Sequence, residues 1–454
     1  MLKSKVAVHA VSFGLLPDDA IMLGESYLKQ WKIPTAQPIT LRLGAYRQPI
    51  KVVSVARYDG MRINQSLARR IGLSSSATLR LHYSEKTSTL SLGPIIGVLI
   101  SRDYPNLPDR PFGSITMFCK ELVDGCANEG AHVFFFTPNG ITEDSETVEG
   151  WVFNNAWKRI SMPYPDIVNN RLTSRKLENK PNVQQFLKEI KMRHSAHVFN
   201  EKFLDKHEVF DALKSDHKLI RYLPESHLLR NYTMLKAMCS KYDSVFLKPV
   251  RGSLGKGIIK ITRTDNGGYQ AMFTTTAGTR KQQFASLVKL FSSINVKMKT
   301  VRYQVQQGLT LIDIAKRPVD FRALVQKNAS GKWTVTSIVA RTAGGAHFVS
   351  NLARGGTLST VKEAIGKSNL LAARQEAPER LQRAALEIAE GIDQHIPAHF
   401  GELGIDLAVD TSGRVWLLEV NSKPSKNDNT PLTELKIRPS VLRMIQYSRY
   451  LSGF

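Results

Sequence analysis

Oxygen-bearing side chains near the C-terminus have the types and spacing of a metal site. Asp406 lies on the apolar segment "GIDLAV", and Glu419 and Asn421 lie two residues apart on the next, "WLLEVN". Residues i and i+2 of a strand share a face, and carboxylates combined with substrate phosphates suit Mg²⁺. We therefore predict that these three residues hold Mg²⁺. The prediction requires Asp406 to face Glu419, which depends on the turn register; an edge hairpin with surface acids is the alternative.

A glycine-rich stretch, "KPVRGSLGKGI", lies between two apolar segments and could bind phosphate. Gly252, Gly255 and Gly257 let backbone N–H groups approach phosphate oxygens, and Lys248 precedes them on the first segment. Ile258 stands where a Walker P-loop needs lysine, and a strand follows instead of a helix, so neither a P-loop nor a Rossmann turn fits. We predict a flexible lid over nucleotide phosphates; a plain glycine hairpin with a surface lysine is the alternative.

Two arginines lie on strands whose other residues are mostly apolar. Arg322 occurs in "VDFRALVQ" and Arg341 in "IVARTAGG", and Asn351 follows in "VSNLARGG". A guanidinium group can hold phosphoryl or carboxylate oxygens with two parallel hydrogen bonds. We predict that these three residues contact the reacting groups. Structural pairing of the arginines with the scarce acids is the alternative, and Asp320 is an obvious partner for Arg322.

Taken in order, these parts resemble the ATP-grasp superfamily. The segments "DFRALVQ", "VARTAGGAHFVSNLARGG", "GIDLAV" and "EVNSKPS" are similar to those of the ribosomal-protein glutamate ligases. The segments "LGPIIGVLIS", "VFLKPVRGSLGKGI" and "NLARGG" are closer still to the YheC/YheD-type ATP-grasp proteins, described as endospore coat-associated. The resemblance spans about residues 91–435 and covers the N-terminal part loosely.

The resemblance implies roles for individual positions. The nucleotide-binding set comprises two lysines, the phosphate loop and a segment beside adenine, where the family usually has an acid: Lys206, Lys248, Gly252, Ser253, Gly255, Lys256, Gly257, Gln306 and Gln307. Phosphate and acyl-phosphate contacts fall to Arg322 and Arg341, and the predicted metal ligands usually hold two Mg²⁺ ions. Ser422 and Lys423 would lie near the reacting phosphate.

The implied chemistry is ADP-forming ligation. A substrate carboxylate attacks the γ-phosphate of ATP to give an acyl phosphate, and an amine then displaces phosphate to form an amide. Such a reaction depends on positioning and charge neutralisation and needs no protein nucleophile. Two alternatives are a nucleotide-binding spore-coat structural protein without turnover and an ATP-dependent kinase on the same fold.

The elements that must position these residues divide the chain into three predicted domains. Residues 1–90 read as short alternating strands, a small β-rich domain; residues 91–200 read as strand, helix and strand, an α/β domain. Residues 201–454 form the ATP-grasp domain, with the lid at about 204–305 and the metal-site half at about 306–454. The fold class is α/β, an α+β ATP-grasp fold with a preceding α/β domain and an N-terminal β-rich domain. We find no internal repeat.

Composition bears on partners and compartment. The 63 Lys and Arg against 39 Asp and Glu leave a net charge of +24, which favours an acidic peptide or protein as acceptor. An amino acid or other amine as the second substrate is implied by the resemblance. The chain shows no nucleic-acid-binding signature. Three cysteines without a CxxC pair argue against disulfides or zinc. No apolar run reaches the ~18–20 residues of a membrane span, so we expect a cytoplasmic protein; spore-coat association is implied by the resemblance.

Overall fold

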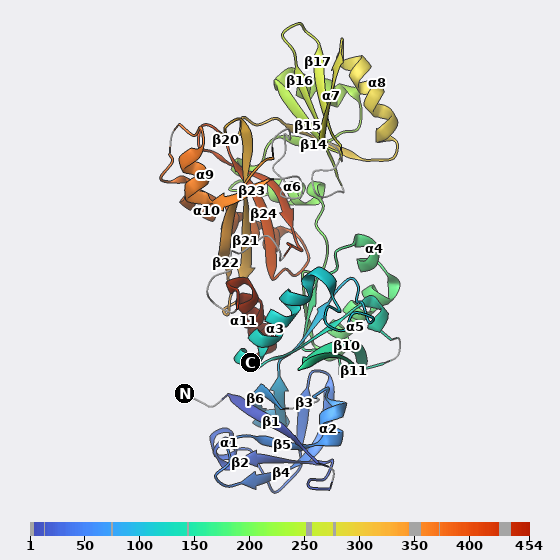
Figure 1. Ribbon diagram of the computed structural model, residues 1–454, viewed down its shortest axis with the longest axis vertical. Helices are drawn as coiled ribbons and strands as arrows, with labels where there is room; N and C mark the ends of the chain where they lie inside the picture. The colour runs from blue at the N-terminus through green and yellow to red at the C-terminus, as the bar shows by residue number, and fades with distance from the viewer. Residues whose placement is uncertain are drawn as a thin grey trace.

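The computed structural model describes residues 4–12, 14–73, 76–142, 145–250, 257–275, 278–344, 356–371, 373–425 and 437–454. Its strands form one closed barrel and three six-stranded sheets. The molecule is elongated, with the N-terminal barrel at one end and the sheet around residues 226–307 at the other (Figure 1). This arrangement confirms the predicted fold class. The division near residues 90 and 200 follows the limits between sheets, and we keep it as a proposal.

The barrel contains the predicted N-terminal strands. In barrel order its strands are β1 (Lys5–Val11), β5 (Met61–Asn64), β2 (Ala20–Gly24), β4 (Tyr46–Val55), β3 (Ile39–Leu43), β7 (Thr89–Gly93) and β6 (Ala77–Ser84), which pairs back to β1. Helices α1 (Glu25–Trp31) and α2 (Gln65–Arg70) follow β2 and β5 directly, and a 3-10 turn, η1 (Glu85–Thr87), joins β6 to β7. Alternating apolar side chains fill the interior, as the sequence alternation predicted.

The barrel has an internal symmetry that the sequence analysis missed. The parallel pair β1–β5 corresponds to the parallel pair β4–β2, and the antiparallel pair β1–β6 corresponds to β4–β3. The barrel therefore consists of two units with the same pairing pattern, β1–β2–α1–β3 and β4–β5–α2–β6. The antiparallel pair β2–β5 joins equivalent strands of the two units. The expectation of no internal repeat is corrected at the level of structure, because two different sequences adopt one pairing pattern.

The second sheet belongs to the predicted α/β domain. Its strands, in sheet order, are β11 (Ala156–Pro163), β10 (Thr147–Asn154), β9 (His132–Phe136), β8 (Ile95–Leu99), β12 (Ile167–Asn170) and β13 (His197–Phe199). The strands β9, β8, β12 and β13 are parallel to one another. The two in the middle of the sheet, β8 and β9, are apolar runs typical of strands buried on both faces. The remaining elements are η2 (Gly113–Ile115), α3 (Thr116–Glu129), η3 (Pro138–Gly140), α4 (Arg175–Glu178) and α5 (Pro181–His194).

The third sheet contains the segment predicted to form the lid, and we call it the lid sheet. Its strands, in sheet order, are β14 (Ser226–Leu228), β19 (Tyr303–Gln307), β15 (Ser244–Pro249), β16 (Ile259–Arg263), β17 (Tyr269–Thr275) and β18 (Gly278–Phe284). Helices α7 (Tyr232–Lys241) and α8 (Leu287–Met298) pack with it in one hydrophobic cluster. Before it come α6 (Lys206–Lys214) and η4 (Ile220–Tyr222). The other face of the lid sheet is therefore available to the rest of the molecule.

The fourth sheet carries the predicted metal-site strands. Its order is β23 (Thr357–Thr360), β22 (Trp333–Thr342), β21 (Arg317–Lys327), β24 (Glu402–Val409) and β25 (Val415–Asn421), and β20 (Asp313–Ile314) pairs with β21. Helix α10 (Ala377–His395) buries its apolar stripe in the same core, and α9 (Val361–Lys367) packs beside it. The apolar residues of α10 recur at helical spacing, which places them on one face of the helix.

The C-terminal helix α11 (Pro439–Ser452) returns to the α/β part of the molecule and lies beside α3 (Figure 1). A Cβ atom added to Gly125 of α3 would lie 2.7 Å from Cδ1 of Ile445, so the glycine permits the close approach of the two helices. Arg438 pairs with Glu121 at 2.7 Å across the same contact. All three cysteines are buried and free. Within the described residues, no helix is both long and apolar enough to cross a bilayer.

Candidate active site

The two strands that carry the predicted metal ligands pair in the required register. On β24 and β25, Asp406 lies directly opposite Glu419, and Gly404 lies opposite Asn421. Residues opposite each other on an antiparallel pair point to the same face. Glu419 therefore has Asp406 beside it and Asn421 two residues further along, as the metal-site prediction requires.

A β-bulge explains why polar ligands occur on an apolar strand. Glu419 pairs with Asp406 and Leu417 pairs with Leu407, which leaves Leu418 as the extra residue. Leu417 is fully buried, whereas Leu418 and Glu419 are half-buried. A bulge shifts the phase of alternation by one residue and can re-aim a side chain near an active site. Leu417 can thus face the core while Glu419, two residues later, faces the site.

Both predicted arginines contact Asp406. Arg322 on β21 lies opposite Asp406 and grips it with two bonds, Nη2 donating to Oδ2 at 2.9 Å and Nε donating to Oδ1. Arg341 on β22 brings Nη2 to 3.1 Å from Asp406 Oδ1, and its Nε donates to Asp320 Oδ1 at 2.5 Å. Asp320, the expected partner of Arg322, pairs with Arg341. Ion pairing and placement in the site are not alternatives here, because Asp406, the partner that the two arginines share, is a predicted metal ligand.

The mutual contacts keep these groups charged. Burial raises the pKa of the Asp406 carboxyl, but the neighbouring Arg322 and Arg341 outweigh burial and hold that pKa below its usual value. Burial alone would lower the pKa of Arg341, whereas Asp406 and Asp320 raise it. Asp406 is thus a carboxylate surrounded by guanidinium donors rather than a protonated acid.

Two predicted lysines approach Glu419 from separate elements. Lys206 is the first residue of α6, whose N-terminus is capped by Asp205 accepting from the Glu208 N–H at 2.8 Å. The Lys206 Nζ lies 3.0 Å from Glu419 Oε1. Burial lowers the pKa of Lys248 on β15 to about 8; repulsion from Lys206 adds to this, and attraction by Glu419 opposes it. Both ammonium groups therefore lie close enough to Glu419 to interact electrostatically with its carboxylate.

The lid strand β19 contributes a glutamine that the sequence analysis missed. Gln304 lies opposite Lys248, and Gln306 lies opposite Ser226, so they share the lid face that Lys248 occupies. Among the described residues, the buried Gln304 Oε1 and Ser226 Oγ have no hydrogen-bond partner. Buried polar atoms without partners are costly, which favours a polar ligand at this face. The available signal was that Gln304 lies two residues before Gln306 on a strand.

The second predicted glutamine has a different environment. The Gln307 side-chain oxygen accepts from the Glu225 N–H at 3.2 Å, and the Gln307 N–H donates to the Glu225 carbonyl at 2.8 Å. Gln307 therefore holds the segment that enters β14, while Gln306 is buried on the Lys248 side of the sheet. The placement of either residue at adenine stays a prediction.

The predicted phosphate loop connects antiparallel strands, because Leu247 on β15 pairs with Ile259 on β16. Gly257 has a left-handed φ of 74°, and its carbonyl accepts from the Tyr303 hydroxyl at 3.2 Å. The other predicted loop residues and the predicted asparagine lie outside the described residues: Gly252, Ser253, Gly255, Lys256 and Asn351.

The chain beyond β25 is held by the α/β part of the molecule. Lys423 forms a buried ion pair with Glu178 of α4. Arg171 donates to the Pro424 carbonyl at 2.8 Å and pairs with Glu402 at the start of β24. Although the sequence placed Lys423 near the reacting phosphate, its ammonium group is engaged by Glu178. The segment is thus an anchor for the strand that ends at Asn421.

The chain is similar to one family over more than half its length. Residues 195–451 match the family described as YheC/D like ATP-grasp. The chain belongs to this YheC/D-like ATP-grasp family. The endospore coat-associated protein YheD of Bacillus subtilis (strain 168) is 31% identical over 367 residues, covering 80% of each protein. YheC of the same organism is 23% identical over 319 residues, covering 68% of this chain and 85% of YheC. Among solved structures, the D-cycloserine synthetase DcsG aligns with a TM-score of 0.46 and 12% identity, covering 78% of this chain and 99% of DcsG.

The candidate metal ligands of this YheC/D-like ATP-grasp protein carry oxygen donors that fit Mg²⁺. Within the described ranges, no group of three or more His, Cys, Asp or Glu residues could hold a metal by itself. Mg²⁺ is commonly bound by one or two carboxylates together with waters and substrate phosphates, so Asp406, Glu419 and Asn421 are a suitable donor set. Asp406 already accepts three bonds of the roughly four that a carboxylate can take. A metal would therefore share Asp406 with the arginines.

The charges around the hairpin suit a phosphate ligand. The cations outnumber the carboxylates in the described cluster: Lys206, Lys248, Arg322 and Arg341 against Asp320, Asp406 and Glu419. Fixed cations in a partly buried site stabilise charge on phosphoryl groups more strongly than exposed ones do. The arrangement can therefore bind a nucleotide polyphosphate together with Mg²⁺.

Proposed function

We propose that this YheC/D-like ATP-grasp protein is an ADP-forming ligase that joins a carboxylate to an amine. The observation that carries the proposal is the convergence of Arg322 and Arg341 on Asp406, directly beside Glu419 and its lysine partner Lys206. This cluster combines acids suited to Mg²⁺ with cations suited to phosphate. Family membership supports ATP as the nucleotide.

The proposed reaction has two steps. A carboxylate oxygen of the acceptor attacks the γ-phosphorus, the bond to the β–γ bridging oxygen breaks, and ADP leaves. The amine nitrogen then attacks the acyl carbon, phosphate leaves, and the nitrogen loses a proton to give the amide. The protein has to hold the reacting oxygens in line and neutralise their charge.

Each described side chain has a role in that scheme. Lys206 on α6 and Lys248 on the lid strand β15 neutralise the phosphates of the leaving ADP, because both lie near Glu419. Arg322 and Arg341 orient the transferred phosphoryl group and the acyl phosphate. Mg²⁺, as one or two ions, would neutralise phosphate charge at the hairpin. Gln304 and Gln306 supply buried amide groups on the nucleotide face of the lid.

The acceptor in this proposal is an acidic peptide or protein, and the amine is an amino acid. The net charge of +24 supports an acidic acceptor, because a basic protein attracts acidic chains over long range. The names of YheD and YheC support association with the spore coat, and we place the enzyme in the cytoplasm before it associates with the coat. In that setting the peptide product would be a coat component.

The test is incubation of the full chain with ATP, Mg²⁺, an amino-acid mixture and glutamate-rich peptides, followed by mass spectrometry. We expect peptide masses increased by one amino-acid residue, with one ADP and one phosphate per amide. Glu419→Gln should reduce ADP formation about 100-fold, because it removes a charged ligand from the phosphate site. Glu149→Gln, at an exposed position on β10, is the matched control and should keep full activity.

Two other outcomes would reject ligation. A mass gain of one phosphate on the peptide would indicate the kinase alternative. The second outcome is a chain that binds ATP but forms no ADP with any amino acid or peptide tested, and whose ATP binding is the same in Glu419→Gln. This result would indicate a nucleotide-binding structural protein.

A further inference from the structure

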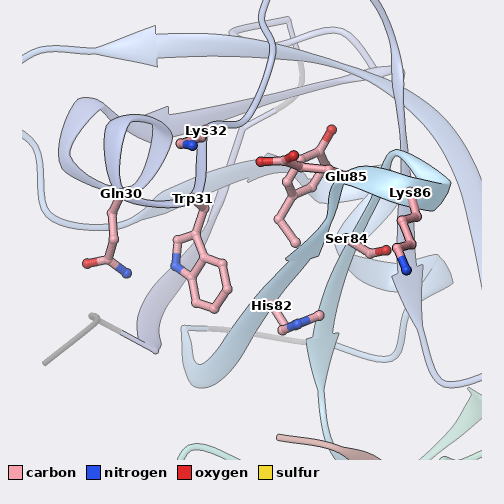
Figure 2. A pocket seen from close by; sticks show the side chains of 8 residues that line it. Gln30, Trp31, Lys32, His82, Ser84, Glu85 and Lys86 are labelled. Carbon is pink, nitrogen blue, oxygen red and sulfur yellow. The ribbon is translucent and has the colours of Figure 1, made fainter.

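A cavity of about 500 Å³ opens on the N-terminal barrel, which lies at the opposite end of the molecule from the lid sheet (Figure 1). One wall is the C-terminal end of α1, with Trp31 and Lys32, and the other is the β6–η1 segment, with His82, Glu85 and Lys86 (Figure 2). Its volume is within the range of ~300–1,000 Å³ found for ligand pockets. No residue of the candidate active site lines it.

An aromatic pair forms the apolar part of this barrel pocket. The rings of Trp31 and His82 meet edge to face with their centroids 5.5 Å apart, and Figure 2 shows both side chains directed into the pocket. The end of α1 is well defined, because the Lys32 N–H bonds the Leu28 carbonyl in a left-handed cap. Trp31 is half-buried, whereas the other tryptophans of the chain are at most 9% exposed. A ligand can therefore reach Trp31, and tryptophans with this partial exposure are frequent anchors in protein interfaces.

Exposed charges surround the aromatic pair. Lys32 and Lys86 lie on opposite walls of the pocket, and both are exposed. Glu85, next to Lys86, is exposed as well. Residues 1–90 contain 13 basic and 5 acidic side chains, a net charge of +8, so the barrel as a whole generates a positive field. Such a field attracts acidic ligands and speeds their association.

We propose that the barrel pocket binds an acidic peptide segment, independently of the ligation chemistry. An apolar or aromatic side chain of the peptide packs against Trp31 and His82, and its carboxylates lie beside Lys32 and Lys86. Glu85 disfavours negative charge on any ligand, but it can accept a hydrogen bond from a backbone N–H, which a peptide has and a nucleic-acid backbone lacks. Two lysines also provide fewer phosphate contacts than nucleic-acid-binding surfaces commonly use.

The test is a titration of the full chain with the blocked peptide Glu-Glu-Phe-Glu-Glu, followed by tryptophan fluorescence and calorimetry at low salt. We expect saturable binding and a change in tryptophan emission that Trp31→Phe removes. The double variant Lys32→Gln and Lys86→Gln should raise the Kd about tenfold, since two partly screened charge contacts are lost. Lys29→Gln is the matched control, because Lys29 is exposed on the same helix but outside the pocket.

Three results would overturn the proposal. The first is the absence of saturable binding to the unmodified chain. The second is an equal loss of affinity in Lys29→Gln and in the double variant, which would indicate nonspecific attraction. The third is tighter binding of a single-stranded oligonucleotide that depends on Trp31 and the two pocket lysines, which would assign the pocket to nucleic acid. None of these readouts depends on ATP turnover, so failure here is distinguishable from failure of the proposed ligase activity.

Discussion

At the residue scale, Asp406 is the centre of the candidate active site. It accepts hydrogen bonds from Arg322 and Arg341 and lies opposite Glu419. Its position on a central strand of the sheet, 7% exposed, makes these contacts stronger than surface ion pairs. One carboxylate thus couples the arginines that we propose to bind phosphate to the predicted metal ligands.

The two-bond grip of Arg322 on Asp406 leads to a prediction for Arg322→Lys. Lysine keeps the charge but cannot reproduce the planar pair of bonds. We expect ADP formation to fall about 100-fold and the free energy of unfolding to fall by about 1–3 kcal/mol, because a buried carboxylate loses partners. Turnover assays and urea denaturation measure both effects. Arg263→Lys, at the exposed end of β16, is the control, and wild-type turnover in Arg322→Lys would contradict the proposed role.

The lowered pKa of Lys248, about 8, leads to a pH prediction. Below pH 8 the side chain is charged and attracts phosphate, and as the pH rises through 8 the nucleotide-free protein loses that charge. We expect the Kd for Mg–ATP to rise about tenfold between pH 7 and pH 9, since a group with a pKa of 8 keeps about one tenth of its charge at pH 9. Calorimetry at several pH values measures this. Lys248→Arg stays charged and should flatten the profile; an equally steep profile in that variant would assign the titration to another group.

At the element scale, the bulge in β25 determines which side chains reach the site. Simple alternation through Val415, Leu417 and Glu419 would put an apolar pair and a carboxylate on one face. The extra residue, Leu418, shifts the phase, so that Leu417 is buried and Glu419 is not. The apolar start of β25 can therefore face the core while its polar end faces the candidate site.

The bulge predicts different stabilities for two adjacent leucine variants. Leu417→Ala should lower the free energy of unfolding by about 2–5 kcal/mol, because it leaves a cavity in the core. Leu418→Ala should cost under about 1 kcal/mol, because Leu418 is half-buried and lies outside the core cluster. Chemical denaturation of both variants measures the difference. Similar losses, or a larger loss in Leu418→Ala, would show that the strand alternates without the bulge.

At the scale of the whole molecule, the metal-site sheet and the α/β sheet are fastened together while the lid sheet extends beyond them (Figure 1). The fastening consists of α11 against α3, and of the Lys423–Glu178 and Arg171–Glu402 pairs. Because Lys423 follows Asn421 by two residues, the α/β part helps to position the end of β25. A lid that closes over nucleotide would then move against a fixed base.

The buried Lys423–Glu178 pair leads to a double-variant prediction. Either Lys423→Met or Glu178→Gln alone should lower the free energy of unfolding by about 3–5 kcal/mol, because each leaves the other charge buried without its partner. The double variant should lose less than the sum of the single losses, because it removes both charges. Urea denaturation of the three variants measures the coupling. Additive losses would mean that the two groups do not depend on each other.

Much of the fold and part of the site could be predicted from the chain itself. Strand alternation indicated the β-rich start, and the succession of strand, helix and strand indicated the α/β part that follows it. The candidate metal ligands Asp406, Glu419 and Asn421 were singled out from residue types and spacing, with the register of their strands left open. The internal symmetry of the barrel could not be predicted, because corresponding units such as "AIMLGESYLKQW" and "MRINQSLARR" share little beyond an apolar pattern.

The sequence by itself determined which chemical groups are present, their order, and the local elements that carry them, because these follow from residue type and short-range periodicity. Only the tertiary structure decided the register of β24 against β25, the bulge at Leu418 and the convergence of both arginines on Asp406. It also brought Gln304 to the face of Lys248 and turned Lys423 to Glu178. These features depend on pairing between segments far apart in the chain. In such pairing, a register shift of one residue moves every side chain of a strand to the opposite face of the sheet.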